Sequence, residues 1–145
     1  LYALAEETLA TLRPAAERRD VTLTLRGGEA VVQGVRTALQ ELVYNLCDNA
    51  VKYNHPGGSV TVTAEKRGGE TVLSVADTGI GIPYEHQNRV FERFYRVDKS
   101  HSRQLGGTGL GLSIVKHAAA MHKARLELWS EPDAGTKITV HFDGQ

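Results

Sequence analysis

One predicted helix, over residues 36–53, combines amide and charged side chains at helical spacing. At about 100° per residue, these side chains form one stripe beside an apolar face. Amide oxygens suit Mg²⁺, a lysine offers a counter-charge to phosphate, and a glutamate can act as a base. The stripe therefore indicates the wall of a ligand site, and a solvated helix face with i,i+4 contacts is the alternative that it leaves open. Its members are Glu41, Asn45, Asn49 and Lys52.

A carboxylate ends a predicted strand and is followed by two glycines, in the run Asp77-Thr-Gly79-Ile-Gly81-Ile. The strand period of two places Asp77 on the same side as Leu73 and Val75, where a charge needs a donor. The glycines let the backbone turn sharply or approach a ligand closely. A ligand with an exocyclic amine, such as adenine, would supply the donor. An Asx-turn, in which Asp77 accepts from its own backbone two residues on, is the alternative.

A second cluster of glycines, at positions 106, 107, 109 and 111, leads directly into a predicted helix. Backbone N–H groups freed by glycines and a helix N-terminus together form a site for anions. Residues 86–103 before it hold five arginines and lysines against two acidic residues. This local surplus suits a polyphosphate better than a solvated face. The glycine spacing fits neither a P-loop nor a dinucleotide-binding motif.

The composition is that of a globular domain with no overall charge. The chain has 145 residues, of which 41% are hydrophobic, and its 17 basic residues balance 17 acidic ones. This balance does not indicate nucleic acid as a partner, and no apolar run approaches the ~20 residues of a membrane span. The lone Cys47 fits a reducing cytoplasm. We expect one domain over 1–145, and the first residue, Leu1, predicts a fragment of a longer chain.

Helices alternate with β-hairpins along the chain, rather than with single parallel strands. This order predicts an α+β two-layer sandwich, in which helices cover one face of a mixed, mostly antiparallel sheet. Pro14 is expected to kink the first helix or end it early. The irregular stretch 95–107 is predicted to be a mobile lid. The expected helices cover 1–18, 36–53, 85–94 and 110–122, and the expected strands cover 21–25, 30–33, 59–65, 71–77, 125–129 and 137–142.

Four segments, taken in this order, resemble the ATP-binding catalytic domain of two-component sensor histidine kinases. Residues 41–53 resemble their N box, and residues 77–82 resemble the first glycine box. Residues 91–96 resemble the F box, and residues 107–112 resemble the second glycine box. The run 45–54 is especially similar to sensor kinases of the phosphate-regulon type. The resemblance implies the Bergerat fold, which type II topoisomerases, a heat-shock chaperone and mismatch-repair ATPases share.

The same resemblance implies roles for individual residues toward ATP and Mg²⁺. Asn45 would bind Mg²⁺, and Glu41 would assist the attacking histidine as a base. Asp77 would accept from the adenine amine, and Arg96 would reach the phosphates from the lid. The full set implied to bind the nucleotide is Asn45, Asn49, Lys52, Tyr53, Asp77, Gly79, Gly81, Ile82, Tyr95, Arg96, Gly107, Thr108, Gly109, Leu110, Gly111 and Thr136.

None of the six histidines lies in the sequence context of a phosphoacceptor box. The resemblance therefore implies transfer of the γ-phosphate of Mg-ATP to a histidine on a separate dimerisation domain of the same protein, for relay to a response regulator. We expect this domain alone to be monomeric, the full-length protein to be a homodimer, and the domain to lie on the cytoplasmic side of an inner- or plasma-membrane sensor. An ATP-driven conformational gate and an anti-sigma serine kinase on the same fold are the alternatives.

Overall fold

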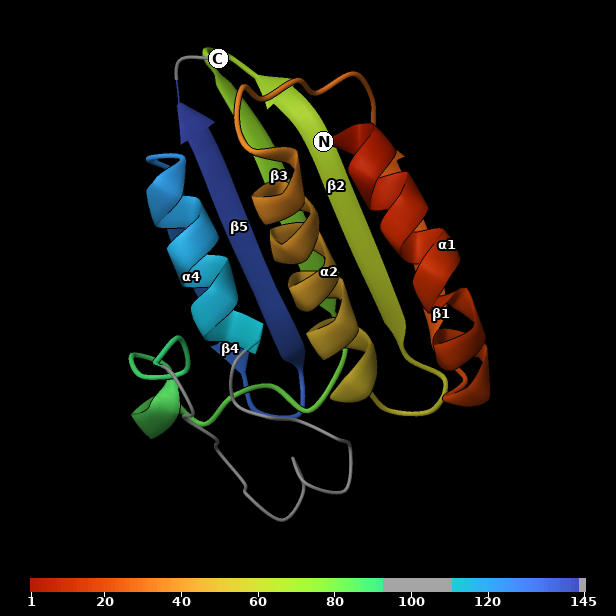
Figure 1. The fold of residues 1–145 in the computed structure, drawn as a ribbon. Coiled ribbons are helices and arrows are strands. Elements are labelled where there is room, and N and C mark those ends of the chain that lie inside the picture. Colours follow the sequence, from red (N-terminus) through yellow and green to blue (C-terminus); the bar gives the residue numbers. More distant parts are fainter. Residues whose placement is uncertain (93–110, 144–145) are drawn as a thin grey trace.

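A computed structural model describes residues 1–92 and 111–143, in which three α-helices cover one face of a five-stranded sheet (Figure 1). The strand order is β1-β2-β3-β5-β4, with β1 parallel to β2 and the remaining neighbours antiparallel. This confirms the predicted two-layer sandwich with a mixed sheet. The helices are α1 (Tyr2–Arg18), α2 (Arg36–Lys52) and α4 (Gly111–Met121), with a 3₁₀ turn, η1 (Tyr84–His86). The strands are β1 (Thr22–Gly27), β2 (Ser59–Arg67), β3 (Glu70–Asp77), β4 (Arg125–Glu131) and β5 (Gly135–Asp143).

The core lies between the sheet and the helix layer, and strand register decides which side chains enter it. Val62 on β2 pairs with Val75 on β3, which pairs with Ile138 on β5, and all three are buried. Asp77 and Thr136 are paired two residues further along the same two strands, so they lie on this same helix-covered face. The alternation of side chains along β3 thus places Asp77 at the edge of the core, as the sequence predicted.

Helix α2 lies between α1 and α4 and packs against both (Figure 1). Its buried side chains recur at the spacing expected of an amphipathic helix. Asn45 and Asn49, in the stripe beside this buried face, lie next to the start of α4. The buried residues of α2 are Leu39, Leu42, Val43, Leu46, Cys47, Ala50 and Val51.

Pro14 does not end the first helix, so of the two expected outcomes, a kink or an early end, the early end is wrong. Helix α1 continues through it to Arg18. An internal proline removes one backbone hydrogen bond, at a cost of about 3 kcal/mol. Leu12 and Ala16, on either side of Pro14, are both buried, and their burial offsets that cost.

The predicted strand at 30–33 is absent, and the predicted helix at 85–94 is only partly helical where it is described. Strand β1 pairs with β2 in parallel, which requires a crossover connection, and residues 28–35 form the part of that connection that leads from β1 into α2. Carbonyls in 30–33 accept hydrogen bonds from outside the sheet ladder: Ala30 O from the Leu1 ammonium at 2.7 Å and Val31 O from Thr71 Oγ1 at 3.2 Å. Residues 84–91 form η1 and successive turns, and 93–94 lie outside the described residues.

No helix within 1–92 and 111–143 combines the length and the apolar character that crossing a bilayer requires.

Candidate functional site

The two asparagines of α2 meet the first residue of α4. A Cβ atom placed on Gly111 would lie 3.4 Å from Asn45 Oδ1 and 3.7 Å from Asn49 Oδ1. Both asparagines are half-buried. The structure therefore brings together three of the predicted site residues, Asn45, Asn49 and Gly111, from segments about 60 residues apart in the chain.

The amide of Asn45 is oriented by its own helix. Its Nδ2 donates to the carbonyl oxygen of Glu41 at 2.7 Å. With the amide donor engaged there, Oδ1 is the atom that faces Gly111. An oxygen in this position is the kind of ligand that Mg²⁺ accepts. The Glu41 side chain, one turn earlier, is exposed to solvent.

Lys52 has a protein partner that the sequence analysis missed. Its Nζ lies 3.0 Å from Asp48 Oδ2, and the two side chains are 27% and 19% exposed. The sequence could have indicated this ion pair, because an acidic and a basic residue at i and i+4 lie side by side on a helix. A phosphate approaching Lys52 would therefore share it with Asp48. Tyr53, the next residue, is half-buried at the end of α2, and its carbonyl accepts from Ile80 N at 3.0 Å.

Asp77 lies at the end of β3 with its carboxylate largely withdrawn from water. Its Oδ1 accepts the backbone N–H of Gly79 at 2.8 Å, so the Asx-turn considered from the sequence is formed. Burial raises the pKa of Asp77 to about 6, against the lowering effects of the Gly79 and Thr136 backbone N–H groups and of His55. A carboxylate has about four acceptor positions, so the turn leaves capacity for an amine donor.

The glycines around Asp77 are required by close contacts between backbone segments. A Cβ on Gly79 would lie 2.3 Å from the carbonyl oxygen of Tyr53, and one on Gly81 would lie 2.1 Å from that of Glu131. A Cβ on Gly135 would lie 2.1 Å from the carbonyl oxygen of Asp77. The loop 78–82 is thus wedged between the end of α2 and the β4–β5 turn. Gly79 and Gly81 build the site by packing against protein backbone.

Replacing Gly81 with alanine is expected to lower the free energy of unfolding by about 3 kcal/mol, because it adds a clash with Glu131 to a strained backbone. The φ angle of Gly81 is 71°. Gly68 is the matched control, since its φ is 63° and a Cβ there meets nothing within 4 Å. Gly68→Ala is expected to cost only about 1 kcal/mol. Urea denaturation measures both, and equal losses would contradict the packing argument.

Two further side chains hold this loop, and the sequence analysis did not single them out. Ser130 Oγ accepts from Ile82 N at 2.8 Å and lies 2.9 Å from Thr136 Oγ1. Gln87 Nε2 donates to the carbonyl oxygens of Ile82 and Ser130, at 2.9 and 3.0 Å. These contacts connect Ile82 with Thr136, both predicted site residues. No local sequence signal marks contacts that span more than 40 residues.

Several predicted site residues lie outside the described residues. They belong to the predicted lid at 95–107 and to the second glycine cluster. They are Tyr95, Arg96, Gly107, Thr108, Gly109 and Leu110.

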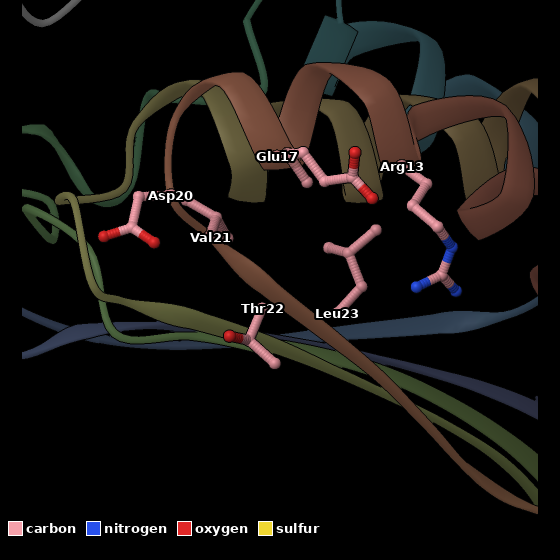
Figure 2. A pocket seen from close by; sticks show the side chains of 7 residues that line it. Arg13, Glu17, Asp20, Val21, Thr22 and Leu23 are labelled. Atoms are coloured by element: carbon pink, nitrogen blue, oxygen red, sulfur yellow. The ribbon is translucent and has the colours of Figure 1, made fainter.

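A pocket of about 320 Å³ lies elsewhere, between the end of α1 and the start of β1 (Figure 2). Figure 2 shows Arg13 and Glu17 reaching from the helix above Leu23. No residue predicted to bind a ligand lines this pocket. The geometry thus separates it from the candidate site at Asn45 and Asp77.

Comparison with known proteins assigns the family. The model for histidine kinase-, DNA gyrase B-, and HSP90-like ATPases matches residues 34–145. The chain belongs to this family. It is 41% identical over 138 residues to the sensor-like histidine kinase SenX3 of Mycolicibacterium smegmatis, which covers 94% of this chain and 36% of that protein. It is 44% identical over 127 residues to the phosphate regulon sensor protein PhoR of Pseudomonas aeruginosa, covering 86% and 28%.

Solved structures agree with this membership. A mycobacterial sensor histidine kinase, MprB, is 32% identical, with a TM-score of 0.84 over 99% of this chain and 95% of that one. The catalytic domain of histidine kinase ThkA, at 21% identity and a TM-score of 0.84 over 99% and 92%, shares the fold. Membership in this ATPase family implies ATP binding, and the similarity to SenX3, PhoR and MprB confirms the predicted resemblance to sensor histidine kinases. The chain spans about a third of the length of the curated relatives named above.

Proposed function

We propose that this chain binds Mg-ATP and transfers the γ-phosphate to a histidine on a dimerisation domain of the same sensor kinase. A response regulator aspartate then receives the phosphate. The observation that carries the proposal is the meeting of Asn45 and Asn49 with the start of α4. The α4 N-terminus supplies backbone N–H groups for phosphate at the place where an amide oxygen is available for metal.

The two ends of the site are connected along α2. Asn45 and Tyr53 are eight residues apart, which is about 12 Å of helix. Beyond Tyr53, its hydrogen bond to Ile80 leads to the loop that begins at Asp77. The proposal therefore places the phosphates near Asn45 and Gly111 and the adenine near Asp77. A nucleoside triphosphate in an extended conformation has a length of this order.

One oxygen from Asn45 fits Mg²⁺. This ion takes one or two protein oxygens and completes its octahedron with phosphate oxygens and water. Within the part of the chain that the structure describes, no group of three or more His, Cys, Asp or Glu side chains could hold a metal by itself. When bound, Mg²⁺ supplies charge neutralisation at the phosphates. The chain itself orients the Asn45 oxygen, through the bond from Asn45 Nδ2 to the Glu41 carbonyl.

Glu41 is proposed as the base that takes the proton from the attacking histidine nitrogen. Its side chain is exposed, so a histidine carried by another domain has access to it. Phosphoryl transfer depends on positioning and on charge stabilisation, and the acceptor must be held in line with the γ-phosphate. The proposal includes a full-length protein that carries the histidine-bearing domain, forms a homodimer and is a membrane-bound sensor. The names of the relatives support the role of a sensor kinase.

Asn45→Ala is expected to abolish the gain in ATP affinity that Mg²⁺ provides, because the variant lacks the amide oxygen. Binding of adenosine is expected to stay unchanged. Calorimetry with and without Mg²⁺ measures both. Gln40→Ala, at an exposed position of the same helix, is the matched control and is expected to behave like the wild type. A full Mg²⁺ effect in Asn45→Ala would remove the metal assignment and leave the adenine end of the proposal standing.

A further inference from the structure

Ser130 makes three hydrogen bonds at the adenine end of the proposed site, and the proposed function does not use it. Its side chain is buried, with 5% of the residue exposed. Ser130 Oγ accepts from Ile82 N at 2.8 Å, donates to the Gly135 carbonyl at 3.0 Å and lies 2.9 Å from Thr136 Oγ1. One hydroxyl therefore links the glycine loop, the β4–β5 turn and the residue paired with Asp77.

The single proton of Ser130 decides the direction of the bond to Thr136. A hydroxyl has one donor and two acceptor positions. The Gly135 carbonyl can only accept, so the proton of Ser130 belongs to that bond. In the contact between the two hydroxyls, Thr136 is then the donor and Ser130 the acceptor. Ser130 thereby reaches its full complement of one donated and two accepted bonds.

This direction leaves Thr136 with only acceptor positions for a ligand. Its proton points to Ser130, so the remaining lone pairs of Oγ1 are what the site meets. Thr136 is paired with Asp77 across β5 and β3, on the same face of the sheet. The ionised carboxylate of Asp77 is also an acceptor. Both polar side chains at this end of the site therefore demand donors from the ligand.

We propose that Ser130 is a positioning residue for base selection, which orients the Thr136 hydroxyl so that the site accepts 6-aminopurines and rejects 6-oxopurines. A 6-amino group brings two N–H donors, which the Asp77 carboxylate and the Thr136 hydroxyl can accept directly. A 6-oxo group brings an acceptor at the same position, so the half-buried acceptors that face it stay unpaired. This inference rests on the proposed nucleotide site and adds how that site selects its base.

Gln87 also holds the 78–82 loop but does not orient the Thr136 hydroxyl proton. A substitution of Gln87 therefore tests the effect of loop position alone. Its Nε2 holds the carbonyls of Ile82 and Ser130, and it does not touch Thr136 in any described hydrogen bond. Gln87→Glu would place a carboxylate against these two carbonyls and displace the loop. That variant is expected to weaken 6-amino and 6-oxo nucleotides by similar factors.

The test measures dissociation constants of ADP and of inosine diphosphate by calorimetry, and their ratio is the readout. Ser130→Ala frees the Thr136 hydroxyl to donate, so the preference for ADP is expected to fall by about 3- to 10-fold. Ser130→Thr, which keeps a hydroxyl, is expected to restore the ratio. Thr136→Val is expected to lower the ratio in the wild-type background and to add nothing in the Ser130→Ala background.

Each contrary result has its own meaning. A wild-type chain that binds neither nucleotide would overturn the proposed function, and this inference with it. A chain that prefers ADP, and keeps that preference in Ser130→Ala and in Thr136→Val, would overturn this inference alone. A fall in the ratio for Gln87→Glu as large as that for Ser130→Ala would assign the effect to loop displacement and also overturn it. If Ser130→Ala does not fold, Ser130→Cys, whose thiol is only a weak donor and acceptor, replaces it in the same comparison.

Discussion

The isolated chain, incubated with ATP that carries a radioactive γ-phosphate, is expected to hydrolyse it slowly and to carry no acid-labile phosphohistidine. The proposed site has its phosphate end at Asn45 and Gly111 and an exposed Glu41 nearby, and none of the six histidines lies in a phosphoacceptor context. Adding a separate dimeric helical hairpin with a phosphoacceptor histidine is expected to give label on the hairpin. Positioning of that acceptor accounts for the difference between no labelling and robust labelling.

Two substitutions sharpen this labelling experiment. Asn45→Ala is expected to abolish labelling of the hairpin, and Glu41→Gln is expected to lower it. Glu6→Gln, at an exposed position on α1, is the matched control for loss of a surface carboxylate and is expected to change nothing. The two fragments are separated on a gel and counted. Robust label on the 145-residue chain itself would contradict transfer to a separate domain.

Asp77→Asn is expected to weaken ADP binding by about 5- to 150-fold, which corresponds to roughly 1–3 kcal/mol for an unpaired buried polar group. The asparagine amide presents a donor toward the adenine amine. Asn keeps an oxygen for the Gly79 N–H, so the turn and the fold are expected to survive. Asp133→Asn, in the exposed part of the β4–β5 turn, is the control with the same chemical change.

The pH dependence of adenosine binding tests the same carboxylate. Because burial raises the pKa of Asp77 to about 6, the carboxylate is ionised above that pH and protonated below it. An amine donor favours the ionised form, so affinity is expected to fall as the pH drops through about 6. Adenosine is the ligand of choice because it has no phosphate to titrate. A pH-independent affinity in the wild type, or the same dependence in Asp77→Asn, would contradict the assignment.

The raised pKa of Asp77 also predicts how the stability of the ligand-free domain depends on pH. This dependence is opposite to that of adenosine binding, because stability falls as the pH rises. The folded-state pKa of Asp77 lies above the ordinary pKa of an aspartate, 3.8, so between these pH values the folded state binds more protons than the unfolded state. The contribution of Asp77 to stability is therefore greatest below the unfolded pKa and declines as pH rises through the folded one. A bound amine donor opposes this decline by favouring the charged form.

Much of the site was predictable because it depends on local periodicity. The 3.6-residue period of α2 placed Asn45 and Asn49 on one stripe, and the period of two in β3 carried Asp77 to the core side. The structure shows both arrangements, and it adds that Gly111 faces the asparagines. Neither period depends on the rest of the chain.

What could not be predicted depends on pairing between distant segments. The predicted strand at 30–33 instead belongs to the crossover that connects the parallel strands β1 and β2 through α2. Ser130 and Gln87 act through hydrogen bonds to residues 48 and 43 positions away, respectively, for which the sequence gives no spacing rule. The close contacts of Gly81 with Glu131 and of Gly135 with Asp77 also join segments that are distant in the sequence, so they could not be predicted either.

The wedged glycine loop also bears on how the adenine end would respond to a competing inhibitor. A compound bound there would rest on a wall whose shape is set by main chain. Substitutions that reshape this wall at Gly79, Gly81 or Gly135 would each drive a Cβ atom to within 2.1–2.3 Å of a carbonyl oxygen. Resistance by altering the wall would therefore damage the fold of the domain that the inhibitor targets, which leaves few tolerated routes of escape at these three positions.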